Sequence, residues 1–421
     1  MNGRRVLISG ASVAGPALAH WLVRYGFDVT VVERAGALRE GGQAVDFRGR
    51  PQMGVLERMG VLEEIRRQQT HMGEVTVIDA RGRRRTSLPS EIASGEVEIL
   101  RGDLARILYE ATSEDAEYVF GDWITSITED AAGAHVTFRH GAPRTFDLVV
   151  GADGVHSGVR RLAFGPESAY RRELGMYHAV FSTGNHLGLD HTGIMYSVPG
   201  KSANVSSARD AARATVALYF ASAPLAYDHH DTEWARRQVA ERFAGEGWEV
   251  PRLLEAMWDA PDFYFDSTSQ IRVDRYSRGR VVLLGDAGYA PGPGGMGTGL
   301  AVVGAYVLAG EMAAARGNHA AAFARYEERM RPYVTVCQKQ GEGADRFMVP
   351  ARRRHIWQRD LIWGTLPHVP WKGLIAKMAT RAAEAITLPD YPAAAPSPRS
   401  RRPLTGTTSG VPATGQSITT A

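Results

Sequence analysis

The chain has 421 residues, of which 44% are hydrophobic and 23% are charged, the composition of an ordinary globular protein. Its length predicts two or three structural units, each able to bury a core. The net charge of +3 is too small to indicate a nucleic-acid partner. The single cysteine, Cys337, excludes an intrachain disulfide and a metal cluster held by several thiolates, which fits a reducing cytoplasm. We expect no signal peptide and no membrane span.

The first predicted elements in chain order form a βαβ unit. A short apolar strand at residues 6–8 precedes helical spacing at 14–25, and a second buried strand follows at 29–32. Two further amphipathic helices are expected at residues 56–69 and 103–112. This order indicates an α/β protein with a parallel sheet.

Two later blocks have a different character. Residues 73–94 alternate between polar and apolar types, which predicts an antiparallel hairpin, and residues 176–221 are also typical of β-structure. Because α/β sequence separates the two blocks, we expect a second sheet built from insertions into the first domain.

The C-terminal third returns to helices. A buried strand is predicted at residues 281–284, and apolar or amphipathic helices at 299–315 and 320–332, the latter continuing in broken form to about residue 386. From residue 392 the chain is Pro, Ser, Thr, Ala and Gly without a hydrophobic pattern, so we expect a disordered tail.

The first motif with chemical meaning is Gly-Ala-Ser-Val-Ala-Gly at residues 10–15, between a predicted strand and a helix. Gly10 permits a tight turn, Gly15 permits close packing of helix and strand, and the helix N-terminus can bind a pyrophosphate. Ser12 stands where a dinucleotide-binding turn has its middle glycine. Glu33 ends the second strand, where a carboxylate can accept hydrogen bonds from ribose hydroxyls. Alone, the motif also fits an ordinary glycine turn, and it does not separate FAD from NAD.

Two further strands end in aspartate. The strand at residues 281–284 runs into Gly-Asp, with Asp286 placed to hold a ribityl hydroxyl, and a glycine-rich loop at 291–299 then leads into a helix. The strand at residues 147–150 ends in Gly-Ala-Asp-Gly, which includes Asp153. Asp153 also fits the simpler role of a helix N-cap.

Together, in this order and spacing, the three motifs resemble the class A flavin-dependent monooxygenases, the group of para-hydroxybenzoate hydroxylase. The likeness is nearest to the tetracycline-inactivating and polyketide-hydroxylating branch. It covers about residues 4–335 and includes Gly-Gly-x-x-x-Asp at residues 41–46 and Arg101, followed by Leu104 and Leu108. An arginine at this place in the family holds the ribityl-phosphate region of the flavin.

The resemblance implies a Rossmann-like FAD-binding domain with an inserted mixed or antiparallel β-sheet substrate domain and C-terminal helices. It places the FAD-binding domain at residues 1–71, 98–168 and 266–335, the substrate domain at 72–97 and 169–265, the C-terminal helices at 336–391 and the tail at 392–421. The residues expected to bind the cofactor are Gly10, Ser12, Val13, Ala14, Gly15, Glu33, Arg34, Gln43, Asp46, Arg101, Asp153, Asp286, Gly295, Gly297 and Thr298. Candidate substrate contacts are Phe181, Tyr196, Tyr219 and Pro293, although such aromatics fit a core equally well.

The resemblance also implies the activity. A cytoplasmic, single-component FAD-dependent monooxygenase would take NADPH or NADH as a transient reductant and add O₂ to the flavin C4a atom. The resulting hydroperoxide would oxygenate an aromatic or polycyclic, largely apolar substrate, in natural-product tailoring or antibiotic modification. The chemistry requires no acid–base pair in the protein, and the sequence indicates none. We expect a monomer or weak homodimer, with no nucleic acid, membrane or metal partner.

Two departures from the family pattern bear on the flavin ring. The usual Gly-Asp-Ala-Ala-His becomes Gly-Asp-Ala-Gly-Tyr, ending at Tyr289, and the Asn and Asp of the following helix are Gly299 and Gly304. These departures leave open a dehydrogenase or desaturase that uses O₂ only as an electron acceptor. A silent flavin-binding partner protein is a further alternative, against which the intact Asp286 loop argues. A flavin halogenase is disfavoured, because no lysine precedes Lys201 and the Trp-x-Trp-x-Ile-Pro motif is absent. The adjacent His229 and His230 are expected in a solvated loop.

Overall fold

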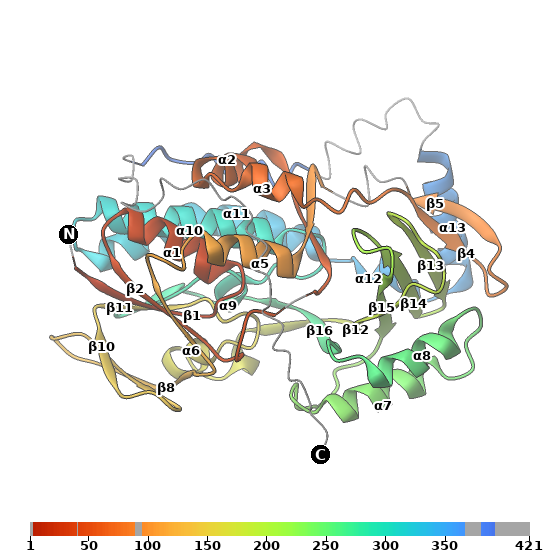
Figure 1. Cartoon of the computed structure of the whole chain (residues 1–421), viewed down its shortest axis with the longest axis horizontal. Coiled ribbons are helices and arrows are strands. Elements are labelled where there is room, and N and C mark those ends of the chain that lie inside the picture. The colour runs from red at the N-terminus through yellow and green to blue at the C-terminus, as the bar shows by residue number, and fades with distance from the viewer. Residues whose placement is uncertain (1–2, 40, 89–94, 367–379, 392–421) are drawn as a thin grey trace, which may run out of the picture.

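The computed structural model describes residues 3–39, 41–88, 95–366 and 380–391, and the tail predicted from residue 392 lies outside them. A six-stranded sheet organises the first unit (Figure 1). Its strands in spatial order are β17 (Ser277–Arg278), β18 (Val281–Leu283), β11 (Leu148–Gly151), β1 (Arg5–Ser9), β2 (Asp28–Glu33) and β7 (Glu117–Phe120). Every pairing is parallel except that of β17 with β18. The central strands are continuous apolar runs because both faces of the sheet are covered.

Helices from distant parts of the chain pack together over this sheet. Helix α1 (Ala14–Arg24) contacts α10 (Gly297–Ala314), which contacts α2 (Gly49–Met59) and α11 (His319–Gly341). By length and composition α10 could cross a membrane, contrary to our expectation from the sequence, but 83% of it is buried inside the protein. Its apolar surface is that of a core helix.

Two predicted helices have different bounds in the structure. The single helix expected at residues 56–69 was wrong: α2 ends before Gly60, and a separate helix, α3 (Leu62–Arg67), follows. Gly60 has φ +75°, the left-handed conformation that ends a helix. In contrast, α11 continues through Pro332 to Gly341. The short α12 (Asp345–Met348) and α13 (Arg353–Thr365) follow, and residues 367–379 lie outside the described part of the chain.

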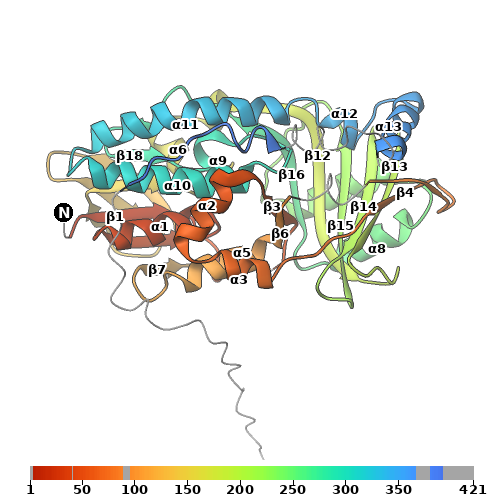
Figure 2. The same cartoon turned by 90° about the horizontal axis from the view of Figure 1, so that it is seen from above.

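The second unit is a seven-stranded mixed sheet. Its order is β16 (Tyr264–Ile271), β12 (Arg171–Gly184), β15 (Arg213–Ala221), β14 (Lys201–Ser207), β13 (Thr192–Val198), β4 (Val75–Ile78) and β5 (Arg84–Leu88). The predicted hairpin is therefore present as β4–β5 over its described residues, and β4 joins β13 in the one parallel pairing of this sheet. Figure 2 shows β12 and β16 at the side of this sheet nearest the first unit.

Two helices that we did not predict cover one face of the second sheet. Helices α7 (Thr232–Phe243) and α8 (Val250–Asp259) bury a core of aliphatic and aromatic side chains between themselves and the strands. Their apolar positions are few but regularly spaced, with Ala235, Val239 and Phe243 buried along α7. On the opposite face, α13 packs against β5 and β13, where Val77 and Met195 are buried with Trp363.

Two smaller sheets and three short connecting helices complete the fold. A three-stranded sheet contains β10 (Arg144–Phe146), β9 (Ala134–Phe138) and β8 (Ile124–Glu129), and a two-stranded sheet contains β3 (Ala44–Phe47) and β6 (Val97–Leu100). Helix α5 (Arg101–Glu110) follows β6 directly, α6 (Gly158–Ala163) follows β11, and α9 (Asp286–Tyr289) follows β18. The first, second and third of the sequence motifs thus all lie at ends of strands.

Candidate functional site

The predicted cofactor residues gather at the carboxyl edge of the parallel sheet. Gly10 follows β1, Glu33 ends β2, Asp153 follows β11 and Asp286 follows β18, and these four strands are neighbours in the sheet. This edge is where open α/β sheets bind their ligands.

The first turn requires both of its glycines. Gly10 has φ +109°, and a Cβ on it would lie 2.4 Å from the carbonyl oxygen of Ala152. A Cβ on Gly15 would lie 1.9 Å from the carbonyl oxygen of Gly10. Helix α1 then begins after Val13 with no side-chain cap and no acidic residue in its first turn. Its free N–H groups and positive dipole end fit a pyrophosphate.

Glu33 lies directly beside this turn. One carboxylate oxygen accepts a hydrogen bond from the backbone N–H of Ala11 at 2.8 Å, and the other accepts one from Ala35 at 2.9 Å. The next residue, Arg34, points elsewhere: its guanidinium lies 4.7 Å from the ring centre of Trp123. Both oxygens of Glu33 are thus bonded within the protein, and the cofactor contacts expected of Glu33 and Arg34 stay predictions.

Arg101 joins three segments of the candidate site. Its backbone N–H donates to the carbonyl oxygen of Gln43 at 3.2 Å, and its Nη2 donates to the Ser12 hydroxyl at 3.3 Å. The neighbouring Gly102 donates to the carbonyl oxygen of Gly41 at 3.0 Å, an approach so close that a Cβ on Gly102 would lie 2.7 Å from the Gly41 nitrogen. The exposed Arg101 side chain thus stands at the first turn, free to contact a bound phosphate.

Asp286 has an uncompensated carboxylate. Burial raises its pKa, and the charge of Arg101 opposes this shift only in part. Within the described residues no group donates a hydrogen bond to it, although the start of α10 is close: a Cβ on Gly297 would lie 3.5 Å from Asp286 Oδ1. Asp286 is half-buried, and a ribityl hydroxyl would supply the donor that its carboxylate lacks among the described residues.

The glycine-rich loop is held against strand β3. Gly295 has φ +76°, and a Cβ on it would lie 2.6 Å from Asp46 Oδ1. Asp46 is itself fixed by Arg48, whose Nε donates to it at 2.6 Å. Beyond the loop, α10 begins at Gly297 and Thr298 without a side-chain cap. The loop therefore presents a second uncapped helix N-terminus to the same edge of the sheet.

The departures from the family pattern are accommodated inside the protein. A Cβ on Gly299 would lie 2.2 Å from the Gln52 side chain, whose Nε2 donates to the Tyr333 hydroxyl at 3.1 Å. Tyr289 is only 1% exposed, and its hydroxyl lies 2.8 Å from that of Tyr326. Tyr289 is thus a core residue of the first unit.

Asp153 ties its own loop together. Its carboxylate accepts hydrogen bonds from the Ser9 hydroxyl at 3.4 Å and the backbone N–H of Val159 at 3.1 Å, and it contacts the Ser157 hydroxyl. Ser157 is the residue that caps α6. These bonds employ both carboxylate oxygens within the protein, and a direct cofactor contact of Asp153 stays a prediction.

The substrate contacts predicted in the second sheet divide between its two faces. Phe181 and Tyr196 are buried in the core with α7 and α8, which is the core role that the sequence left open beside a pocket wall. Their strands alternate, and the opposite face carries Tyr219, which is the register partner of His178. Pro293 lies in the glycine-rich loop and is half-buried.

A charged cluster that the sequence did not reveal connects the two units. His156, from the loop after β11, lies with Nε2 2.9 Å from Asp266 Oδ2 and Nδ1 3.1 Å from Glu167 Oε1. Asp266 also accepts hydrogen bonds from Tyr264 at 2.9 Å and from Tyr227 at 2.8 Å. Burial would lower the pKa of His156, but hydrogen bonds and charges from Asp266 and Glu167 outweigh it and raise that pKa to about 9.

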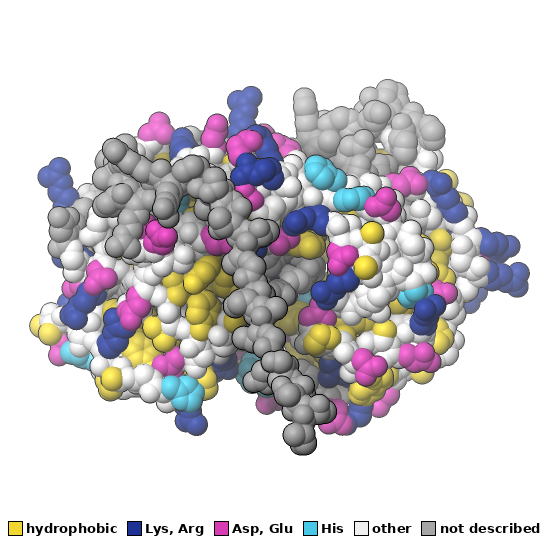
Figure 3. Space-filling view, viewed as in Figure 1, with side chains coloured by type: hydrophobic (Ala, Val, Ile, Leu, Met, Phe, Trp, Pro, Cys, Tyr) yellow, Lys and Arg dark blue, Asp and Glu magenta, His cyan; other side chains and the backbone are white. Residues whose placement is uncertain are grey.

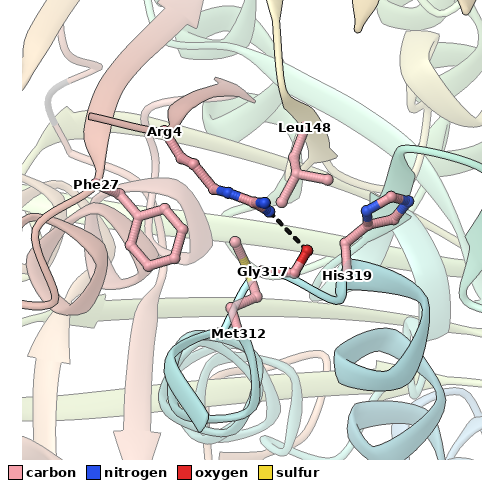
Figure 4. A pocket seen from close by; sticks show the side chains of 6 residues that line it. All are labelled: Arg4, Phe27, Leu148, Met312, Gly317 and His319. Carbon is pink, nitrogen blue, oxygen red and sulfur yellow. Dashed lines mark hydrogen bonds between the residues drawn. The ribbon is translucent and has the colours of Figure 1, made fainter. Parts of the chain in front are cut away.

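Two features elsewhere in the protein do not belong to this site. A cavity of about 10 Å³, room for little more than a water molecule, lies at the amino edge of the parallel sheet (Figure 4). It is lined by Arg4, Phe27, Leu148, Met312, Gly317 and His319. The exposed Asp228, His229 and His230 lie close together, but the His229 ring stacks on His156 at 4.3 Å and His230 Nε2 lies 3.1 Å from Arg34. We assign no metal to this group.

Known proteins resemble this chain over most of its length. The family described as FAD binding domain matches residues 4–339. The chain belongs to this family. It is similar to an uncharacterized protein of Mycobacterium tuberculosis, 45% identical over 338 residues that cover 79% of this chain and 91% of the relative. A flavin-dependent monooxygenase from an unknown prokaryotic organism is 39% identical over 343 residues, or 80% and 88% of the two chains.

A solved structure of similar organisation is that of the tetracycline destructase Tet(51). It has 34% identity and a TM-score of 0.82, and the match covers 93% of this chain and all of the other. The chain is therefore an FAD-dependent monooxygenase with a Rossmann-like cofactor domain, near the tetracycline-destructase branch. On the face shown in Figure 3, basic and acidic side chains are interspersed over this enzyme's surface.

Proposed function

We propose that this monooxygenase uses NADH or NADPH and O₂ to oxygenate an aromatic or polycyclic small molecule, in natural-product tailoring or antibiotic modification. The observation that carries the proposal is that the charge of Arg101 acts both on Asp286, in the candidate cofactor site, and on Tyr264, on the face of the second sheet that carries Tyr219. Relatives described as tetracycline destructases and as a fungal FAD-dependent monooxygenase support an aromatic or polycyclic substrate.

The protein's own contribution is binding and orientation. The uncapped start of α1 and the Arg101 guanidinium hold the phosphates, and the glycine loop before the uncapped α10 turns backbone N–H groups toward the edge of the flavin ring. Asp286 and Glu33 accept hydrogen bonds from hydroxyl groups. A bound flavin would accept electrons from the nicotinamide and would then activate O₂. The second sheet closes the site and orients the substrate carbon toward the flavin.

The dehydrogenase alternative was left open by the departures at positions 289, 299 and 304, and the labelling experiment below tests it. Tyr289 itself is turned into the core toward Tyr326.

The test is mass spectrometry of products formed under ¹⁸O₂ from a panel of phenols, indoles and polycyclic aromatics, with NADH and NADPH tried separately. One labelled oxygen atom per product molecule is expected. A product that has lost two hydrogens and carries no label would instead establish a dehydrogenase. Asp286→Ala, assayed without added FAD, is the control for turnover that does not depend on the cofactor.

A further inference from the structure

The most exposed large apolar side chains of the described residues gather on one stretch of the chain. The four that are at least half exposed are Phe347, Trp357, Leu361 and Ile362. Phe347 belongs to α12 and the other three to α13. Single apolar residues scattered over a surface are ordinary, but a gathered set marks a surface that contacts a partner.

The opposite side of α13 is packed and paired within the protein. Arg359 donates to the Ser197 hydroxyl of β13 at 3.2 Å and to the Phe347 carbonyl oxygen at 3.0 Å, which ties α12 to α13. Asp360 accepts a hydrogen bond from Arg359 at 2.9 Å and pairs with Arg85 of β5 at 3.2 Å. The helix is therefore held in place by its buried side, and its outer side is not needed for that packing.

The outer side of α13 combines apolar and basic residues. Arg354, Trp357 and Leu361 are spaced by three and four positions, so they lie on one face of the helix. The single acidic residue of α13, Asp360, lies on the buried side. Among the described residues, no carboxylate pairs with Arg352, Arg353 or Arg354. We call Phe347, Trp357, Leu361 and Ile362, with Arg352, Arg353 and Arg354, the α13 surface.

Further arginines lie at the same end of the second sheet. The Gly200 N–H donates at 3.0 Å to the carbonyl oxygen of Pro350, just before α13, and the parallel pairing of β13 with β4 puts Gly200 at the end where β4 turns into β5. Figure 3 shows basic side chains projecting from the end of the molecule where Figure 1 places this hairpin. The exposed arginines of the hairpin are Arg81, Arg83, Arg84 and Arg85.

Carboxylates balance these hairpin arginines only in part. Arg83 pairs with Asp79 and Arg84 with Glu74, while Arg81 has no acidic partner among the described residues. The arginines at the start of α13 add to this excess. The far end of the second unit is therefore locally basic, a feature that the net charge of +3 averages out over the whole chain.

Charge complementarity decides among the partners that such a surface could meet. A two-fold contact with a second copy of the chain would bring Arg353 and Arg354 against like charges. A nucleic acid would meet the arginines but would leave Trp357, Leu361 and Ile362 without an apolar environment. An anionic bilayer offers phosphates to the arginines and an acyl boundary to the apolar side chains, and tryptophan is typical of that boundary.

We propose that the α13 surface is a peripheral docking site for a bilayer that contains anionic phospholipids. Trp357, Leu361 and Ile362 enter the boundary between headgroups and acyl chains, while the arginines contact phosphates. The contact is with one leaflet and involves no span. It revises our expectation of no membrane partner, which rested on the whole composition. Because α13 and Tyr219 share one face of the second sheet, docking turns that face toward the bilayer.

The experiment measures co-sedimentation of the full-length, FAD-loaded protein with sucrose-loaded vesicles. One set is phosphatidylcholine alone, and the other contains about one-third phosphatidylglycerol. Wild type is expected to bind the anionic vesicles at least about tenfold more tightly, and added salt should weaken this binding by screening the charges.

Two variants separate the basic from the apolar contribution. Arg353→Gln with Arg354→Gln should weaken binding to anionic vesicles by about tenfold or more. Trp357→Ser with Leu361→Ser should weaken it by a similar factor, since less apolar surface is buried on docking. All four side chains are exposed, so both variants should fold and retain FAD, which thermal unfolding and flavin absorbance measure.

Matched controls change the same residue types elsewhere. Arg139→Gln with Arg275→Gln removes two exposed arginines beside β9 and β17, and Trp258→Ser removes an exposed tryptophan of α8, on the opposite face of the second sheet. These controls should bind vesicles as wild type does. Because the basic and apolar variants are independent, either of them tests the surface if the other does not fold.

Four results would overturn the inference. Equal binding to both vesicle types would exclude recognition of anionic lipid, and equal losses in the variants and the controls would exclude the α13 surface. Full binding by the variant with serine at positions 357 and 361, beside a loss in the arginine variant, would identify a general polyanion surface. A wild-type dimer that this serine variant converts to monomers, without vesicle binding, would identify a contact between copies, and sedimentation velocity measures it.

Discussion

The hydroxyl oxygen of Tyr289 occupies the space that a side chain at residue 304 would need, because a Cβ on Gly304 would lie 2.2 Å from it. That hydroxyl pairs with Tyr326, which donates to the carbonyl oxygen of Leu283 at 3.1 Å. A residue of α9, one of α10 and one of α11 are thus fitted around the end of β18. The two departures from the family pattern at positions 289 and 304 form one compensated pair.

The first prediction is a coupling between these positions. Gly304→Ala should lower the free energy of unfolding by about 1–3 kcal/mol through overpacking, and Tyr289→Phe by about 1 kcal/mol through the lost hydrogen bond. The double variant should lose less than the sum, since the clashing oxygen is gone. Urea unfolding of all four proteins measures this. Gly54→Ala in α2 is the control: a Cβ there meets only Arg58 at 3.8 Å, so stability should rise by up to about 1 kcal/mol. Strict additivity would show that positions 289 and 304 are independent.

The FAD-binding unit was readable because its information is local. Gly10 and Asp286 each lie in a strand–turn–helix segment whose apolar run, glycines and polar residue are contiguous in sequence. The parallel pairing of β1, β11 and β18 then brings the separate segments to one edge without further information.

The substrate side was less readable because its contacts are distant. His156 stands just after the Gly-Ala-Asp-Gly motif, but Asp266 lies 110 positions later and stands in no motif. Strand β12 is buried on both faces near its centre. Alternation therefore could not separate Phe181, on the face that α7 and α8 cover, from the residues on the opposite face. Helix α7 was missed because its exposed face is strongly charged and only every fourth residue is buried.

The second prediction concerns FAD affinity. Purified protein should carry one non-covalent FAD per chain, and Asp286→Ala should weaken its binding by about 1.5–3 kcal/mol, the value of hydrogen bonds to a charged acceptor. Fluorescence titration of the apoprotein with FAD measures the dissociation constant. Asp190→Ala, at a side chain that is 82% exposed, should leave it unchanged. Equal affinities in the two variants would remove Asp286 from the site.

The third prediction separates charge from geometry at Arg101. Arg101→Ala should keep the fold and weaken FAD binding by one to two orders of magnitude, roughly 1.4–2.8 kcal/mol. With FAD in excess it should form hydrogen peroxide in place of product, because the flavin is no longer held in position. Arg101→Lys should restore binding only in part, since an ammonium lacks the planar two-point contact. Arg106→Ala, on the same helix, is the control and should retain FAD affinity. An unaltered ratio of product to peroxide in Arg101→Ala would show that this side chain is solvated and idle.

The fourth prediction is a dependence of stability on pH. Because the pKa of His156 is raised from 6.5 to about 9 in the folded protein, its stabilising contribution is fully present below pH 6.5 and is lost as the pH rises through about 9. The free energy of unfolding should fall across this window, and His156→Gln, which cannot titrate, should flatten the dependence. Urea unfolding at a series of pH values tests this. Glu167→Gln should move the decrease in the free energy of unfolding toward lower pH. An unmoved decrease would show that Glu167 does not contribute to the raised pKa of His156.

The fifth prediction concerns the C-terminus. Truncation after Tyr391 should leave folding and FAD content unchanged, because residues 392–421 have no hydrophobic pattern with which to form a core. Truncation after Leu388 should destabilise the protein. It removes Tyr391, whose ring lies against Gly310 and whose hydroxyl donates to Glu311 at 2.8 Å. Thermal unfolding and the flavin absorbance of both proteins measure the outcome. Insolubility of the protein truncated after Tyr391 would show that residues 392–421 pack against the rest of the chain.

Strands β12 and β16 have a mechanical consequence. They pair antiparallel from Arg171 and Ile271, beside the cofactor unit, to Val180 and Tyr264 within the second sheet. The two segments that pass between the units are therefore hydrogen-bonded to each other as one two-stranded ribbon. A hinge between the units would have to break or bend that ribbon, and its irregularity lies between Glu173 and Tyr177. The enzyme is therefore built as a stiff frame. If reductant and substrate approach the flavin from different sides, the ring system of the cofactor is the part that travels between them.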